Sequence, residues 1–237
     1  MNISYRFSFQ DGTQQRINVD LLRNAEGAAP GQTMRAAPAP LPGWTRLDFQ
    51  QCPNCPLSAA QHANCPAAAD LAPTIGAFAN IISYAEARVE VETPERTISR
   101  DCQVQQALNS LVGLIMSTSA CPILGRMRGL ARTHLPFATI EETLLRSVGS
   151  YLVGQLALQQ QGGAPDWQLA GLKAHYAELE VLNRAFKQRV NAATKEDAVL
   201  NAISTWGVLS TGVGLSLDDL LSDLTPFLTT TGWPATA

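Results

Sequence analysis

The start of the chain alternates between apolar and polar side chains on both sides of a turn signal. ISYRFSF, residues 3–9, and QQRINVDL, residues 14–21, each alternate, and the Asp-Gly pair at 11–12 lies between them. Alternation puts every second side chain on one face of a strand, and Asp-Gly favours a tight hairpin turn. The pattern therefore predicts a β-hairpin. ARVEVETPERTIS alternates in the same way around Pro94, which predicts a further strand or hairpin near 88–99.

Two segments between these strands have different patterns. Residues 24–43 combine prolines and glycines with almost no large apolar side chain, which is typical of a flexible loop. Residues 43–49, GWTRLDF, predict a third strand, and a cysteine-rich stretch follows at once. The expected organisation is a β-hairpin and strand unit over 1–50, which contains the loop 24–43, followed by a cysteine loop over 51–70.

From residue 71 the apolar positions follow the period of a helix more often than that of a strand. They predict a short helix near 71–82 and longer helices at 101–118, 139–161, 167–192, 195–210 and 216–228. Thr139 and Glu142 form the sequence pattern of a capping box. The clearest apolar stripe consists of Leu169, Leu172, Tyr176, Leu179, Leu182, Phe186 and Val190. The chain is therefore expected to be α+β, with a small N-terminal antiparallel β unit, a cysteine loop and a mostly helical domain over 71–237.

Composition and charge narrow the class of protein. Of the 237 residues 46% are apolar, which is enough for a hydrophobic core. The net charge of −3 gives no field that would attract nucleic acid or an anionic membrane. No apolar run approaches the roughly 20 residues of a membrane helix, and the start of the chain does not resemble a signal peptide. A cytoplasmic protein is expected, in which thiols stay reduced and clustered cysteines indicate metal rather than disulfides.

Four of the five cysteines are each followed by proline: Cys52, Cys55, Cys65 and Cys121. Proline has no N–H and pushes the residue before it toward an extended conformation, which ends local secondary structure and turns the thiolate toward a bound ion. The C-x2-C spacing of the first pair lets two thiolates face one ion from a tight turn. The pattern predicts a four-cysteine metal site between the β unit and the helices. Cys102 lacks the proline and is expected to be a packed helix residue.

The spacing also bears on the metal. Structural zinc with four cysteines usually has two C-x2-C pairs, whereas this chain has one pair and two isolated cysteines. That asymmetry favours an iron–sulfur cluster, and Cys-Pro is found at such clusters. Zinc is the alternative, and simple packing of the thiols or haem ligation are weaker ones. His62 is a candidate extra or replacement ligand, although a lone loop histidine is more often solvated.

These residues support several hypotheses of function. The first is a cytoplasmic iron–sulfur protein with a redox-sensing or electron-relay role, in which Arg126 and Arg128 meet an acidic protein partner. The second is a zinc-stapled structural or interaction protein without redox activity. An enzyme using His134 or His175 is a third, but no G-x-S-x-G, Walker or dinucleotide motif is present. His175 is expected to be a core-edge residue hydrogen-bonded to a neighbour, and its partner in H-x2-E is Glu178.

Several motifs together resemble an uncharacterised bacterial family, a domain of unknown function with a CPNCPL…CP…CP cysteine framework. They are FSFQDG, QCPNCPL with the following CP, VEVETPERT, the Ala-Cys-Pro at 120–122 and THLPFA at 133–138. The resemblance covers about 45–225 and leaves 24–43 outside. It implies that the four Cys-Pro positions and His134 belong to a recurring framework, and it implies no reaction.

Overall fold

The computed structural model describes residues 1–23, 41–193, 222 and 225–226. The predicted helix 195–210, most of the predicted helix 216–228 and residues 24–40 of the predicted loop lie outside the described residues.

The predicted β-hairpins combine into one four-stranded antiparallel sheet with the strand order β2-β1-β3-β4. The first hairpin consists of β1 (Asn2–Phe9) and β2 (Gln14–Asp20), and the second of β3 (Glu86–Glu92) and β4 (Thr97–Gln103). β1 pairs with β3, so that Tyr5 lies opposite Val91 and Phe7 opposite Val89. The first hairpin is confirmed, and the predicted strand or hairpin near 88–99 is a hairpin. The pairing of β1 with β3 places two distant segments of the chain side by side.

The two faces of the sheet differ as the alternation requires. Tyr5, Phe7 and Val89 are fully buried and belong to the hydrophobic core. The intervening side chains form ion pairs instead: Arg6 with Glu90 at 2.9 Å, Arg16 with Glu92 at 2.8 Å, and Arg88 with Asp101 at 3.2 Å. One face therefore packs on the helices, and the other carries charges at the surface.

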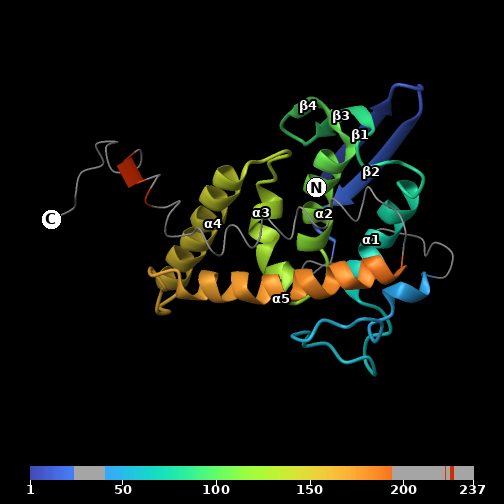
Figure 1. The fold of residues 1–237 in the computed structure, drawn as a ribbon. Helices are drawn as coiled ribbons and strands as arrows, with labels where there is room; N and C mark the ends of the chain where they lie inside the picture. The colour runs from blue at the N-terminus through green and yellow to red at the C-terminus, as the bar shows by residue number, and fades with distance from the viewer. Residues whose placement is uncertain (24–40, 194–221, 223–224, 227–237) are drawn as a thin grey trace.

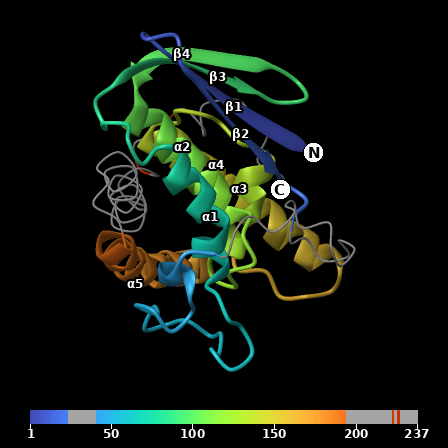
Figure 2. The same ribbon diagram turned by 90° about the vertical axis from the view of Figure 1, so that its right-hand side faces the viewer.

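The helices cover the apolar face of the sheet. They are α1 (Pro66–Ala77), α2 (Val104–Ser117), α3 (Arg128–Arg132), α4 (Ile140–Gln160) and α5 (Ala170–Ala193), with the short 3₁₀ helices η1 (Gly43–Thr45) and η2 (Leu124–Met127). Figures 1 and 2 show the sheet on one side, α1 and α2 beneath it, and the long α5 beyond them beside the cysteine loop. The α+β prediction is confirmed.

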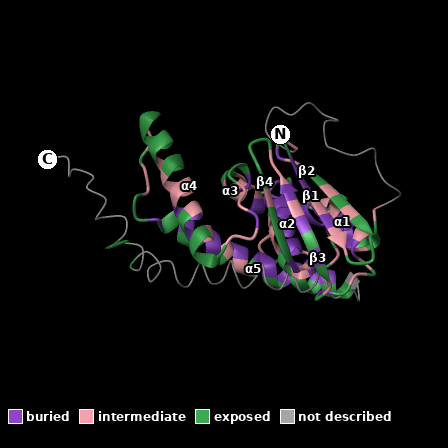
Figure 3. Ribbon diagram, turned by 90° about the horizontal axis from the view of Figure 1, so that it is seen from above, coloured by how far each residue is buried: buried purple, intermediate pink, exposed green. Residues whose placement is uncertain are grey.

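Helices α4 and α5 follow the sequence signals closely. The Thr139 hydroxyl accepts a hydrogen bond from the Glu142 N–H at 3.1 Å, and the Glu142 carboxylate accepts one from the Thr139 N–H at 2.8 Å, which completes the predicted capping box. Every residue of the predicted α5 stripe is buried. The C-terminal half of α4 is mostly exposed and projects from the body of the protein (Figure 3). No helix within the described ranges is both long and apolar enough to cross a membrane.

Three predicted elements are wrong in part. Residues 43–49 form η1 and a single bridge between Arg46 and Asn64 instead of a third strand. α1 begins at Pro66, inside the predicted cysteine loop, because proline is favoured in the first turn of a helix. The predicted helix 101–118 begins only at Val104, because β4 continues to Gln103.

Candidate metal centre

The four cysteines that precede proline line one small cavity. Cys52, Cys55, Cys65 and Cys121 share it with the apolar side chains of Leu47, Leu57, Ile123, Leu124, Leu182 and Phe186, among others. The cysteines come from three separate segments, and α5 supplies Leu182 and Phe186. The fold therefore brings together the four residues that the Cys-Pro pattern singles out.

The first pair is held in a tight turn against α5. The N–H of Cys55 donates to the carbonyl of Cys52 at 3.0 Å, which closes the C-P-N-C turn. The side-chain amide of Asn54 donates to the carbonyl of Glu178 at 2.9 Å, and the Cys52 thiol lies 3.9 Å from the carbonyl of Leu182. Both half-buried cysteines thus have a fixed position relative to the helix.

Cys65 is positioned by the start of α1 and by the last residue of η1. Its N–H donates to the carbonyl of Thr45 at 2.7 Å. It is the residue that precedes the first turn of α1, and its extended backbone (φ −67°, ψ 119°) is the conformation that the following Pro66 favours. The proline therefore has the expected effect at this ligand candidate.

Cys121 follows the end of α2 after a short connection. Its N–H donates to the hydroxyl of Ser119 at 3.3 Å, and its carbonyl accepts from the N–H of Gly125 at 2.8 Å. These bonds set Cys121 in a turn between α2 and η2, near the position that the sequence predicts, and its side chain is buried.

The cavity is apolar and its thiols are spread around it. Its volume is about 20 Å³, which is enough for about one water molecule. Among the described residues, no three His, Cys, Asp or Glu side chains form a group arranged to hold one metal ion. The four thiols therefore face a common space without converging on a single point.

Burial disfavours the thiolate form at three of the cavity cysteines. Desolvation, followed by the charge of Cys65, raises the pKa of Cys52 to about 12, and burial also raises the pKa of Cys65 and of Cys121. The N–H groups of Ala67 and Ala68 act in the opposite direction at Cys65, although neither makes a full capping hydrogen bond to its sulfur. Thiolates would therefore need a positive partner inside the cavity to form at neutral pH.

Arg189 of α5 is a buried cation beside these thiols. Its side chain is 1% exposed, and its charge lowers the pKa of Cys52 and of Cys65. It forms no ion pair within the described residues, although the Asp48 carboxylate lies near enough to feel its charge. Its donors bind the carbonyls of Trp44 at 2.8 Å, Arg46 at 2.6 Å and Leu47 at 3.2 Å. A buried guanidinium bound to carbonyls favours negative charge nearby.

The other sequence candidates lie outside this cavity. His62 is exposed and is not among the cavity residues. Cys102 is buried as expected, but it lies on strand β4 rather than on a helix. His175 is buried at the core edge; its Nδ1 lies 3.6 Å from Glu178, and neither ring nitrogen has the neighbour hydrogen bond that the sequence interpretation expected.

The arginines that follow Cys121 have structural roles. Arg126 forms an ion pair with Glu178 at 2.5 Å and is half exposed. Arg128 donates to the carbonyls of Arg23, Thr118 and Ser119, at 2.9, 3.4 and 3.2 Å. Because its donors bind the main chain, Arg128 fixes the turn between α2 and α3. Of these two arginines, only Arg126 has a largely solvent-exposed side chain.

A comparison with family models matches almost the whole chain. The family described as a domain of unknown function (DUF6901) matches residues 3–228. The resemblance to an uncharacterised family is confirmed, and the match extends beyond the expected 45–225 and across 24–43. No curated protein and no solved structure matches the chain.

Proposed function

The chain belongs to the DUF6901 family, whose function is unknown, and we propose from its own residues that it is a metal-binding protein holding an iron–sulfur cluster at Cys52, Cys55, Cys65 and Cys121. The observation that carries the proposal is that these four cysteines, and not Cys102, line one cavity. If cysteines lined this cavity only by chance, they would not be expected to be the same four that precede proline.

Electrostatics supports a metal over plain packing. Thiolates bound to iron or zinc leave a net negative charge at the centre, and Arg189 is a buried cation that forms no ion pair among the described residues. The N–H groups of Ala67 and Ala68 near Cys65 add further positive potential. Packing of neutral thiols would gain nothing from a cation at this position.

The preference for a cluster over a single zinc ion rests on the spacing of the cysteines. The chain has one C-x2-C pair and two isolated cysteines, whereas structural zinc with four cysteines usually has two such pairs. The cavity of about 20 Å³ holds about one water molecule, and the thiols are not grouped around one point in the described part of the chain. Either metal would therefore require the four side chains to rearrange around it.

Partial exposure of the first pair is consistent with a redox-sensing or electron-relay role. Cys52 and Cys55 are half-buried, whereas Cys65 and Cys121 are buried. A cluster bound here would lie close enough to the surface for exchange with a protein partner. An acidic partner would have to compete with Glu178, which is paired with Arg126. The proposed location is the cytoplasm, where the free thiols would stay reduced until they bind the cluster.

The decisive experiment is elemental analysis with an ultraviolet–visible spectrum on the full chain purified without oxygen and without added metal. Iron and sulfide in stoichiometric amounts, with a broad visible band that bleaches on reduction with dithionite, are expected. Stoichiometric zinc in a colourless protein would replace the cluster by a structural zinc site. Absence of both metals, also after reconstitution with iron and sulfide, would overturn the metal proposal.

Cysteine variants identify the ligands. Cys121→Ala should abolish the visible band, and Cys102→Ala is the matched control, because Cys102 is equally buried but lies on β4. Cys102→Ala should retain the full iron content. Loss of iron in Cys102→Ala together with its retention in Cys121→Ala would show that the ligand set is wrong.

A further inference from the structure

A second cavity lies between four helices, away from the cysteines. Its volume is about 120 Å³, and its walls come from α2, from η2 and α3, from the segment before α4, and from α4 and α5. Most of the wall is apolar, with Leu114, Leu124, Met127, Leu130 and Leu179. Of these residues only Leu124 also lines the cysteine cavity. The space is therefore a separate pocket of the size that holds one small ring, since an apolar cavity of roughly 150 Å³ accepts benzene.

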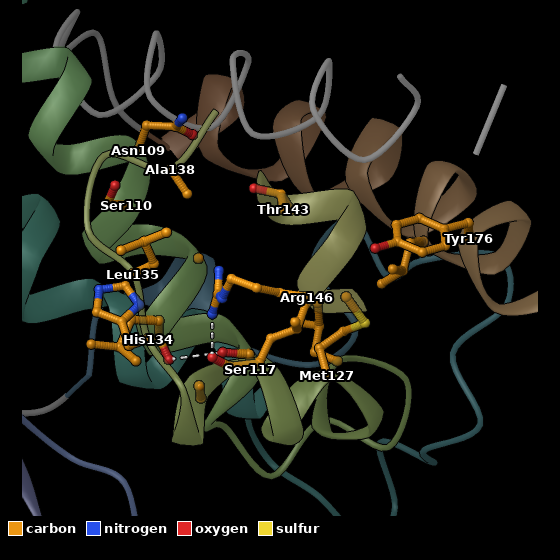
Figure 4. Close-up of a pocket in the computed structure, with 16 residues that line it drawn as sticks. Asn109, Ser110, Ser117, Met127, His134, Leu135, Ala138, Thr143, Arg146 and Tyr176 are labelled. Atoms are coloured by element: carbon orange, nitrogen blue, oxygen red, sulfur yellow. Dashed lines mark hydrogen bonds between the residues drawn. The ribbon is translucent and has the colours of Figure 1, made fainter. Parts of the chain in front are cut away.

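One cation enters this apolar pocket. The Arg146 side chain extends from α4 toward the side of the pocket where Leu135 and His134 lie (Figure 4). Its Nη2 donates to the carbonyls of Leu130 at 2.7 Å and Thr133 at 2.8 Å, which fixes its position. Its Nε is buried without a hydrogen-bond partner, and Arg146 makes no ion pair within the described residues. The guanidinium therefore has an unused donor, and its charge is offset only through the nearby carboxylate of Glu142, with which it forms no direct ion pair.

Further positive charge surrounds Arg146 from the other side. Arg146, His134 and Leu135 also line a neighbouring cavity of about 410 Å³, together with Arg96 and Arg132. Arg96 and Arg132 are exposed and have no ion-pair partner in the part of the chain that the structure describes, and Glu95 is the one acid in this wall. The positive potential around Arg146 would attract an anion toward it from solution.

We propose that the pocket binds a small organic monoanion, an apolar ring or short branched chain with one carboxylate, whose carboxylate pairs with Arg146 and whose apolar body packs against Leu114, Met127 and Leu179. One carboxylate matches the one cation within the pocket, whereas a dianion such as phosphate would leave a second charge buried without a partner. Two neutral polar groups of the wall are already engaged: Ser117 donates to the carbonyl of Leu114 at 3.2 Å, and Ser110 accepts from the N–H of Phe137 at 2.8 Å. The Oδ1 of Asn109 is buried in the same wall without a hydrogen-bond partner, and as an acceptor it would not bind a carboxylate.

This inference is independent of the proposed metal, because no cysteine lines the pocket. Benzoate is the probe that fits its size and charge, benzamide is the neutral analogue of the same shape, and inorganic phosphate is the anion without an apolar body. Titration of the full chain, followed by protein NMR and calorimetry, should show saturable binding of benzoate at least about tenfold tighter than that of benzamide, and no binding of phosphate in the pocket.

Three variants locate the binding. Ala138→Phe fills the pocket from its rim and should weaken benzoate binding at least about tenfold. The double variant Arg96→Ala, Arg132→Ala should weaken it a few fold and reduce its dependence on salt. Arg184→Ala is the control, since Arg184 is exposed and paired with Glu180, and it should change nothing. Arg146→Lys should weaken binding while the protein stays folded, because it keeps the charge but loses the planar donor set.

Four results would overturn the inference. They are equal affinity for benzoate and benzamide, unchanged binding in Ala138→Phe, tighter binding of phosphate than of benzoate at Arg146, and absence of benzoate binding at tens of millimolar. The third result would assign the pocket to inorganic anions, and the fourth would leave it as a packing defect. The metal content of the same samples, measured in parallel, is expected to be unaffected by every one of these variants.

Discussion

The side-chain amide of Asn54 donates a hydrogen bond to the main-chain carbonyl of Glu178, 2.9 Å away. Asn54 lies between the two cysteines of the C-P-N-C turn, and Glu178 lies on α5, one turn before Leu182, which lines the cavity. A single bond between residues 124 positions apart thus sets the distance between the first two thiols and the helix that closes their cavity. The turn by itself would leave this distance free.

Asn54→Ala should therefore loosen the cysteine turn without removing a ligand. We expect a loss of about 1 kcal/mol in the free energy of unfolding, which is typical for one such hydrogen bond, and faster loss of bound metal to a chelator. Urea unfolding and the rate of bleaching with a chelator measure the two effects. Asn80→Ala, at an exposed position, is the control and should match the unchanged protein. Equal chelation rates for the two variants would show that the bond does not hold the turn.

Arg189 joins α5 to the segment after η1 and also faces the thiols. Arg189→Met should lower the free energy of unfolding by roughly 3 kcal/mol, because the carbonyls of Trp44, Arg46 and Leu47 lose a charged donor in a buried place. If the cavity holds thiolates, the loss should be larger in the metal-loaded protein than in the chelated one. Denaturant unfolding of both forms measures this difference. Arg184→Met is the exposed control, and an equal loss in both forms would contradict the role of Arg189 as a counter-charge.

Local signals account for the parts of the fold that the sequence predicts correctly. The Asp-Gly turn and the alternation around it define the first hairpin, and Thr139 with Glu142 defines the start of α4. The Cys-Pro pattern also separates the four cavity cysteines from Cys102. Each of these features depends on the conformational preferences of residues within a few positions of one another.

The errors come from partners that are distant in the sequence. Residues 43–49 alternate like a strand, but both edges of β1 are already paired with β2 and β3. Three main-chain carbonyls of this segment, those of Trp44, Arg46 and Leu47, accept hydrogen bonds from the Arg189 side chain instead of from a neighbouring strand. The sequence contains a signal for the burial of Arg189. It lies three positions after Phe186, which places this charged residue at the edge of the apolar stripe of α5. Arg146 gave no comparable signal, since the carbonyls of Leu130 and Thr133 that hold it are visible only in the folded chain.

The capping box at the start of α4 gives a test of one correctly predicted feature. Thr139→Ala removes the hydroxyl that accepts from the Glu142 N–H, and it should lower the free energy of unfolding by about 1 kcal/mol. Glu141→Gln is the control, because Glu141 lies in the same first turn but outside the box. Chemical denaturation of both variants measures the difference. A larger loss in Glu141→Gln than in Thr139→Ala would show that first-turn charge, and not the box, stabilises this end of the helix.

His134 makes stability depend on pH in the acid range. Burial, with a smaller contribution from the charge of Arg146, lowers the pKa of His134 to about 3, and its Nε2 is hydrogen-bonded to the hydroxyl of Tyr5. In the unfolded chain the imidazole takes up a proton near its ordinary pKa of about 6.5. Between these two values the unfolded state binds more protons than the folded state, so stability falls as the pH is lowered.

The contribution of His134 is thus complete above about pH 6.5 and is lost progressively down to about pH 3, by roughly 5 kcal/mol in total. His134→Gln should flatten this part of the stability curve, because glutamine does not titrate and can still bind the Tyr5 hydroxyl. Urea unfolding from pH 7 to pH 4 measures the difference between the two curves, which removes the common effect of the carboxylates. His62→Gln, at an exposed histidine, is expected to leave the curve unchanged. If the His134→Gln curve falls as steeply as that of the unchanged protein, the acid sensitivity belongs to other groups.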